Sequence, residues 1–140
     1  MHYTDDLIRQ VLTAKTIAVV GFSANPARAS HGVARFLQAR GHRIIPVNPG
    51  LAGQTLLGEK VYASLADISG NVDMVDVFRN STQAGGVVDE AILLKASKGI
   101  RSVWMQLGVV DEAAAKRGEA AGLTVIMDRC PKIEVGRLGL

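Results

Sequence analysis

The chain lacks several features that mark large classes of protein. Only one of its 140 residues, Cys130, is a cysteine, which excludes an internal disulfide framework and argues against a cysteine-rich zinc site. No apolar run approaches the roughly 20 residues that cross a bilayer. The N-terminal stretch MHYTDDLIRQVLTAK carries acids where a signal peptide carries basic residues. We therefore expect a cytoplasmic protein with no membrane partner.

Aromatic residues and charge of one sign are also scarce. Phe, Trp and Tyr make up 4% of the chain, the formal net charge is +3, and the basic residues are scattered. A surface that stacks nucleic-acid bases needs aromatic side chains beside a basic patch, so we expect no nucleic acid partner. A small positive surplus is compatible with an anionic small molecule.

The remaining composition, 48% hydrophobic and 21% charged, is that of a globular domain. The length suits one domain over residues 1–140. Apolar periodicity predicts a leading helix within residues 1–15 and later helices over 30–41, 84–98 and 111–121. Short apolar runs predict strands at 17–20, 43–47, 74–78, 102–106 and 123–127. The tail, 128–140, is expected to be irregular.

Strands that alternate with helices predict the α/β class. We expect a Rossmann-like three-layer sandwich with a five-stranded parallel sheet in the order 3-2-1-4-5. Ligands of such sheets bind at the carboxyl ends of the strands. Two residues inside the predicted strands are notable. We expect Trp104 to lie in the core, and we expect Asp76 to pair with a backbone or basic group.

The stretch after the first strand has the pattern of an anion site. Gly21 ends the apolar run, a turn of small and polar residues follows, and a helix begins near Ser30. The first N–H groups of a helix lack partners and carry the positive end of its dipole, so a phosphate binds there well. Hydroxyl donors from Ser23 and Ser30 and the guanidinium of Arg28 would add to it.

Two common nucleotide sites are disfavoured. A dinucleotide site wants G-x-G-x-x-G after the first strand and an acid after the second. Here Gly21 is followed by FSANP, and the second strand ends in Val47-Asn48-Pro49. A P-loop also fails, because no G-x-x-x-x-G-K-[ST] occurs.

Five motifs, each placed after a predicted strand, carry a different resemblance. They are VVGFSANPARAS (19–30), PVNP (46–49), VDVFR (75–79), WMQLGV (104–109) and MDRCPKIE (127–134). With them the chain resembles the small stand-alone CoA-binding proteins of bacteria and archaea. Their domain is similar to the N-terminal CoA-binding domain of the succinyl-CoA synthetase α-subunit. The resemblance implies a ligand, coenzyme A or an acyl-CoA, bound at the carboxyl ends of the strands.

The resemblance also implies a role for each motif. The phosphates would lie at the first helix, and the adenosine would lie after the second strand, where a missing acid leaves room for the 3′-phosphate. The third strand would flank the adenine or diphosphate, and the last two would line the pantetheine. The implied contacts are Gly21, Phe22, Ser23, Pro26, Arg28 and Ser30; Val47, Asn48 and Pro49; Phe78 and Arg79; and Gln106, Gly108, Met127 and Arg129.

Cys130 is the last of the implied ligand contacts, and it suggests a redox reaction with the ligand. It follows the fifth strand beside Arg129 and Lys132, whose charges favour a thiolate. We hypothesise a mixed disulfide between Cys130 and the CoA thiol under oxidation. The alternative for Cys130 is a small buried apolar side chain.

The function that follows is a CoA-binding carrier or sensor module without catalysis, because no nucleophile–base pair or paired carboxylates can be placed together from the sequence. An alternative is an enzyme acting on a CoA thioester or phosphorylated metabolite, with Asp128, Cys130 and Glu134 as candidates. A third hypothesis is a nucleotide-binding regulator with an unidentified protein partner.

Overall fold

The computed structural model describes residues 2–140 and arranges them around one parallel sheet. Every neighbouring pair of its strands is parallel. The positions confirm the five predicted strands to within one residue at each end. The strands are β1 (Thr16–Val20), β2 (Arg43–Val47), β5 (Met74–Val77), β6 (Ser102–Met105) and β7 (Thr124–Ile126).

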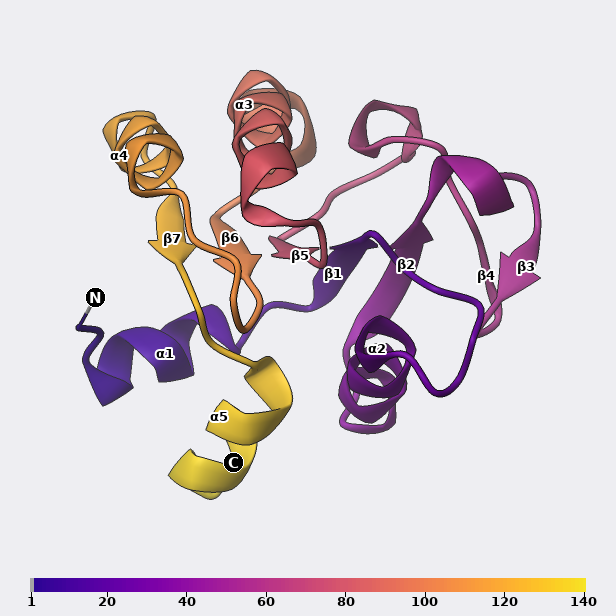
Figure 1. Cartoon of the computed structure of the whole chain (residues 1–140), viewed down its shortest axis with the longest axis horizontal. Helices are drawn as coiled ribbons and strands as arrows, with labels where there is room; N and C mark the ends of the chain where they lie inside the picture. Colours follow the sequence, from indigo (N-terminus) through magenta and orange to yellow (C-terminus); the bar gives the residue numbers. More distant parts are fainter. Residues whose placement is uncertain (1) are drawn as a thin grey trace.

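Helices cover both faces of this sheet, which confirms the three-layer prediction. Figure 1 shows α3 and α4 over one face and α1, α2 and α5 over the other. Short 3-10 turns, η1 (Pro49–Leu51) and η2 (Leu65–Asp67), lie in the connection that follows β2. The helices are α1 (Asp5–Val11), α2 (Ala29–Ala39), α3 (Ser81–Lys98), α4 (Glu112–Ala120) and α5 (Pro131–Leu138).

The strand order is β2-β1-β5-β6-β7. Counted over the five parallel strands this is 2-1-3-4-5, so the predicted order 3-2-1-4-5 was wrong. The connection from β2 to β5 passes through η2, which packs against α3 on the face opposite α2. Crossing on that face brings the chain back beside β1 rather than beside β2. β2 is therefore an edge strand of this sheet, which tolerates the missing N–H of Pro46.

Two elements were absent from the sequence-based expectation. A small antiparallel hairpin, β3 (Thr55–Leu56) with β4 (Glu59–Lys60), forms in the glycine-rich loop after β2. The tail is helical rather than irregular, since α5 starts at Pro131 and ends at Leu138, and its C-cap residue Gly139 has a left-handed backbone. Across residues 2–140 we find no helix with the length and apolar character needed to cross a membrane.

Strand residues alternate between the two layers of the core. Ala18 and Val20 join the cluster beneath α3 and α4. Ile17 and Val19 join the cluster that contains α1, α2 and α5. Because both faces are covered, β1 is apolar throughout, as its sequence predicted.

Asp76 lies inside the second of these layers. It pairs in register with Val19 on one side and Trp104 on the other, and it is fully buried. Neither carboxyl oxygen has a hydrogen-bond partner among the described residues, so the expectation that Asp76 pairs with a backbone or basic group was wrong. Burial raises the pKa of this carboxyl well above its ordinary value because the ionised form would be desolvated.

Candidate functional site

The five parallel strands end in a row along one edge, which we call the carboxyl edge. In order across the sheet, Asn48 follows β2, Gly21 follows β1, Phe78 follows β5, Gln106 follows β6 and Met127 follows β7. The chain leaves β1 toward α2 on one face and leaves β5 toward α3 on the other. The gap between β1 and β5 is therefore the topological switch point, where open α/β sheets hold ligands.

The corrected strand order changes which candidates are neighbours. In the predicted order, Phe78 and Arg79 would lie beyond β2, away from the first loop. In the structure the Phe78 N–H donates to the Val20 carbonyl oxygen, 2.8 Å away. Arg79 therefore follows a strand that lies directly beside the loop after β1.

The backbone conformation and the packing at position 21 require a glycine. Its φ is +89°, in the left-handed region that side chains disfavour. A Cβ at this position would lie 2.8 Å from the carbonyl oxygen of Phe78. The close approach of β1 and β5 at the switch point thus depends on a residue without a side chain.

The loop from Gly21 to Ser30 is held by its own side chains. The Ser30 hydroxyl oxygen accepts from the Ser23 N–H at 2.9 Å, and the Ser23 hydroxyl oxygen accepts from the Asn25 N–H at 3.1 Å. Asn25 in turn accepts from the Ala27 N–H. Both serine hydroxyls keep a proton that they can donate to an anion.

The first turn of α2 has no side-chain cap. Its N-cap residue is Arg28, with extended backbone angles and no capping hydrogen bond. The other long helix next to the edge, α3, is capped by Asn80, which accepts from the Gln83 N–H. An uncapped helix start leaves N–H groups for an acceptor from outside.

Phe22 does not face the edge. Its side chain is fully buried, and its ring lies 5.2 Å from the ring of His31. His31 is itself buried, with Nδ1 2.9 Å from the Ser23 carbonyl oxygen. His31 therefore shapes the loop from beneath, a role that its sequence position gave no reason to expect.

The end of β2 is tied to the same loop. The Val47 carbonyl oxygen accepts from the N–H groups of Gly21 and Phe22, at 3.0 and 3.3 Å. The Asn48 side chain donates to the Phe22 carbonyl oxygen at 2.7 Å and accepts from the Gly50 N–H at 2.8 Å. Val47 and Asn48 thus lie where the sequence predicted, beside the first loop, and Pro49 is exposed next to them.

The ends of β6 and β7 form a second linked group. The Gly108 N–H donates to the Asp128 carboxylate at 2.7 Å, and Asp128 has a left-handed φ of 55°. The Trp104 indole N–H donates to the Arg129 carbonyl oxygen at 2.9 Å. Trp104 is fully buried, as predicted. Gln106 is only 6% exposed, and its Oε1 has no partner among residues 2–140.

The Arg129 side chain is engaged by other residues, and the Cys130 side chain is buried. Arg129 lies 3.7 Å from the Glu134 carboxylate and over the ring of Tyr3. Cys130 is buried, as is Met127. Glu134 is also buried and pairs with Arg137 at 3.0 Å, so it is an ionic anchor for α5.

Two arginines at the switch point have no acidic partner. Neither Arg28 nor Arg79 forms an ion pair or side-chain hydrogen bond with the described part of the chain. Arg28 is exposed and Arg79 is half-buried. Together with the uncapped α2 they make this part of the carboxyl edge electropositive, and Pro26 lies exposed beside them.

Comparison with known families shows to which family the chain belongs. Residues 15–136 match the family described as the CoA binding domain. The chain belongs to the CoA binding domain family. This confirms the resemblance drawn from the five motifs that follow the strands.

Relatives of this CoA binding domain match it over most of their length. The uncharacterized protein YneT of Bacillus subtilis is 42% identical over 127 residues, which cover 90% of each chain. A hypothetical protein from Pyrococcus horikoshii OT3 superposes with a TM-score of 0.88 at 35% identity, over 99% of this chain and 94% of that one.

A larger protein contains a similar unit. The dinucleotide-forming acetyl-coenzyme A synthetase 1 of Ca. Korarchaeum cryptofilum, solved with phosphate and ADP, matches 87% of this chain at 25% identity and a TM-score of 0.68. Only 27% of the synthetase is covered. The similarity is therefore confined to one part of that enzyme.

Proposed function

We propose that residues 1–140 form one domain that binds coenzyme A or an acyl-CoA along the carboxyl edge, as a carrier or sensor without catalysis. The observation that supports this proposal best is the uncapped start of α2 at the switch point, with Arg28 and Arg79 unpaired beside it. Membership of the CoA binding domain family supports the choice of ligand.

The phosphates of the ligand belong in the first loop. The helix dipole and the free N–H groups of α2 favour a negative charge there. Ser23 and Ser30 have protons to donate, and Arg28 and Arg79 supply guanidinium groups that match phosphate geometry. Gly21 lets the backbone approach the diphosphate without a Cβ in the way.

The adenosine end lies toward β2. Val47, Asn48 and Pro49 border this part of the edge, and none of them is acidic. An acid at this point would repel a phosphorylated ribose. The absence of one suits the 3′-phosphate that distinguishes CoA from its dephosphorylated form.

The pantetheine arm then extends toward β6 and β7. Gly108 is exposed there, and the buried amide of Gln106 has an oxygen without a partner. A peptide-like N–H of the arm would satisfy that oxygen. Met127, Arg129 and Cys130 lie at the far end of the row, where the thiol or thioester would come to rest.

The chemistry of the edge favours binding over catalysis. Asp128 accepts the Gly108 N–H, and Glu134 is paired with two arginines. Each of these carboxylates already holds structure together, so neither is a free acid or base. If the alternative were correct, acyl-CoA would turn over and the rate would fall in Asp128→Asn or Cys130→Ser.

A binding experiment tests the proposal. Isothermal titration with CoA and with 3′-dephospho-CoA should give a complex for both, with CoA bound more tightly. Arg79→Gln should weaken CoA binding about tenfold, because a charge-assisted hydrogen bond to phosphate is lost. Arg35→Gln is the matched control, since Arg35 is an exposed cation on α2 with no partner among residues 2–140.

Native mass spectrometry of the protein, purified without added ligand, gives an independent check. A bound mass equal to CoA or an acyl-CoA is expected. The proposal fails if CoA does not bind at micromolar concentrations while another nucleotide does, or if Arg79→Gln and Arg35→Gln bind CoA equally well.

A further inference from the structure

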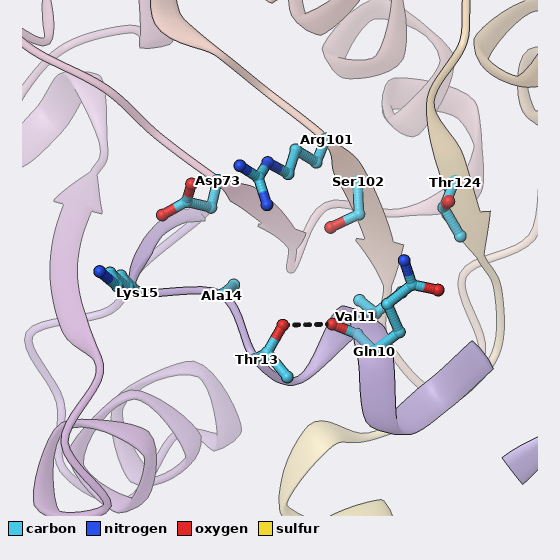
Figure 2. Close-up of a pocket in the computed structure, with 9 residues that line it drawn as sticks. All are labelled: Gln10, Val11, Thr13, Ala14, Lys15, Asp73, Arg101, Ser102 and Thr124. Carbon is cyan, nitrogen blue, oxygen red and sulfur yellow. Dashed lines mark hydrogen bonds between the residues drawn. The ribbon is translucent and has the colours of Figure 1, made fainter. Parts of the chain in front are cut away.

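A cavity of about 600 Å³ lies at the opposite edge of the sheet, where the strands begin. We call this the amino edge. Figure 2 shows the end of α1 and the turn after it forming one wall, and the starts of β6 and β7 forming the other. This size falls within the range of small-molecule sites. No part of the carboxyl edge described above contributes to it.

Two cations lie in the wall of this cavity without acidic partners. Lys15 precedes β1 and Arg101 precedes β6, and both are exposed. Neither forms an ion pair or a side-chain hydrogen bond anywhere in residues 2–140. In Figure 2 the Arg101 guanidinium extends across the space between Asp73 and Ser102. Such unpaired cations over a concave polar surface attract an anion.

The same wall carries one fixed carboxylate. Asp73 precedes β5, and its Oδ2 accepts from the Thr16 N–H at 2.9 Å. That bond fixes the orientation of the carboxylate and leaves Oδ1 free to accept. Asp73 forms no ion pair with Arg101 despite their closeness in the lining.

Neutral polar groups complete the lining. Ser102 is 4% exposed, and its hydroxyl makes no hydrogen bond to the described residues, although it points toward α1 across the cavity. The Gln10 amide lies toward Thr124 on the other side. A hydroxyl that faces the cavity without a protein partner is available to hydrogen-bond a ligand there.

We propose that the amino-edge cavity is a second ligand site, for a small organic anion with a hydroxyl or amino group. A carboxylate or phosphate ester of the ligand meets Arg101 and Lys15, the donor group meets the free oxygen of Asp73, and Ser102 contributes a further hydrogen bond. This site is separate from the CoA site, because the length of the strands lies between them.

A titration followed by ¹H–¹⁵N correlation spectra tests the proposal on the whole chain. The probes are O-phospho-L-serine, glycerol 3-phosphate and inorganic phosphate. The two organic probes should shift the amide signals of Thr13, Ser102 and Thr124. Arg101→Gln and Lys15→Gln should each weaken that binding about tenfold, and Arg35→Gln should leave it unchanged. The spectra themselves report whether each variant is folded.

Three results would overturn the proposal. One is the absence of shifts at millimolar probe, and another is shifts confined to the loop from Gly21 to Ser30, which would place the anion at the CoA site only. A third is equal affinity in Arg101→Gln and Arg35→Gln. Inorganic phosphate that binds as tightly as the organic probes would overturn the role of Asp73, because it lacks the organic hydroxyl or amino group that we assign to that carboxylate.

Discussion

The two faces of the sheet are covered by different chemistry. Beneath α3 and α4 the buried cluster is made of Val, Leu, Ile, Ala and Met. The opposite layer, with α1, α2 and α5, includes Phe22, Trp104 and Cys130 and encloses the carboxyl of Asp76. The first layer serves packing and also reaches the carboxyl edge, through Val47 and Met127. The second combines packing with the groups that shape the carboxyl edge, so a change there affects both stability and binding.

The largest effect should come from Gly21→Ala, at the switch point between β1 and β5. Its positive φ and the 2.8 Å approach to the Phe78 carbonyl leave no room for a Cβ. We expect a loss of at least about 2 kcal/mol in unfolding free energy, together with loss of CoA binding. Urea denaturation and CoA titration measure the two effects.

Gly32→Ala is the control for this change, because a Cβ at that helical position meets nothing within 4 Å. It should be neutral or stabilising. If Gly21→Ala proved as stable as Gly32→Ala, that result would contradict the close approach of Gly21 to the Phe78 carbonyl.

The purely aliphatic layer is tested by a pair of glycines. A Cβ on Gly118 of α4 would lie 2.8 Å from Val125 Cγ2 and 3.4 Å from Val88 Cγ1, so Gly118→Ala should destabilise by about 1–3 kcal/mol. Gly86 of α3 has open space around it, and Gly86→Ala should stabilise by roughly 0.5–1 kcal/mol. Thermal melts of the pair should move in opposite directions, with CoA affinity unchanged in both. Shifts in the same direction would contradict the tight packing of α4.

The layer that encloses the carboxyl of Asp76 is tested by the substitution Asp76→Asn and by the pH dependence of stability. The pKa of Asp76 is raised in the folded state, so above the unfolded pKa of about 3.9 the folded chain binds more protons than the unfolded chain. Stability therefore falls as pH rises from that value toward the folded pKa. Asp76→Asn should remove this slope and stabilise the protein on the order of 1 kcal/mol at pH 7.

Urea denaturation at several pH values measures that slope. An unchanged pH slope in Asp76→Asn would mean that this carboxyl ionises in the folded protein.

The smallest effect on stability is expected from Cys130→Ser. Cys130 is the N-cap residue of α5 and makes no side-chain capping bond, so we expect a change within about 1 kcal/mol. If the CoA thiol reaches Cys130, oxidised wild-type protein should carry a covalent CoA mass that reductant removes. Cys130→Ser should carry none. An adduct that persists in the serine variant would exclude Cys130 as its site.

Much of the fold could be predicted from local patterns. Runs such as Ile17–Val20 are apolar because both faces of the strand are buried, and that signal is local. Strand order is not local. It depends on which face the chain from β2 to β5 crosses, and the segment that decides this is the three-residue turn η2. Pro46 was the one sequence sign that β2 lies at an edge.

Other features that the sequence analysis did not predict also depend on more than local sequence patterns. The helix α5 is short, but Pro131 at its first turn is a start signal that could have been used. Asp76 was expected to pair because a buried charge usually does, and the sequence cannot show that the carboxyl has no neighbour. The loop after β1 was located from Gly21 and Ser30, whereas the buried side chains of Phe22 and His31 beneath it required the three-dimensional structure.

The leading helix α1 lies outside the span that matches the family, residues 15–136, but packs against the rest of the chain. The Tyr3 hydroxyl oxygen accepts from the Met127 N–H at the carboxyl edge, and Gln10 lines the cavity at the amino edge. Between them Ile8 and Leu12 are each about 1% exposed. A version trimmed to residues 15–136 would uncover the layer around Trp104 and remove the wall of the cavity that Gln10, Val11, Thr13 and Ala14 form. For expression or fusion, the chain should be cut ahead of Tyr3.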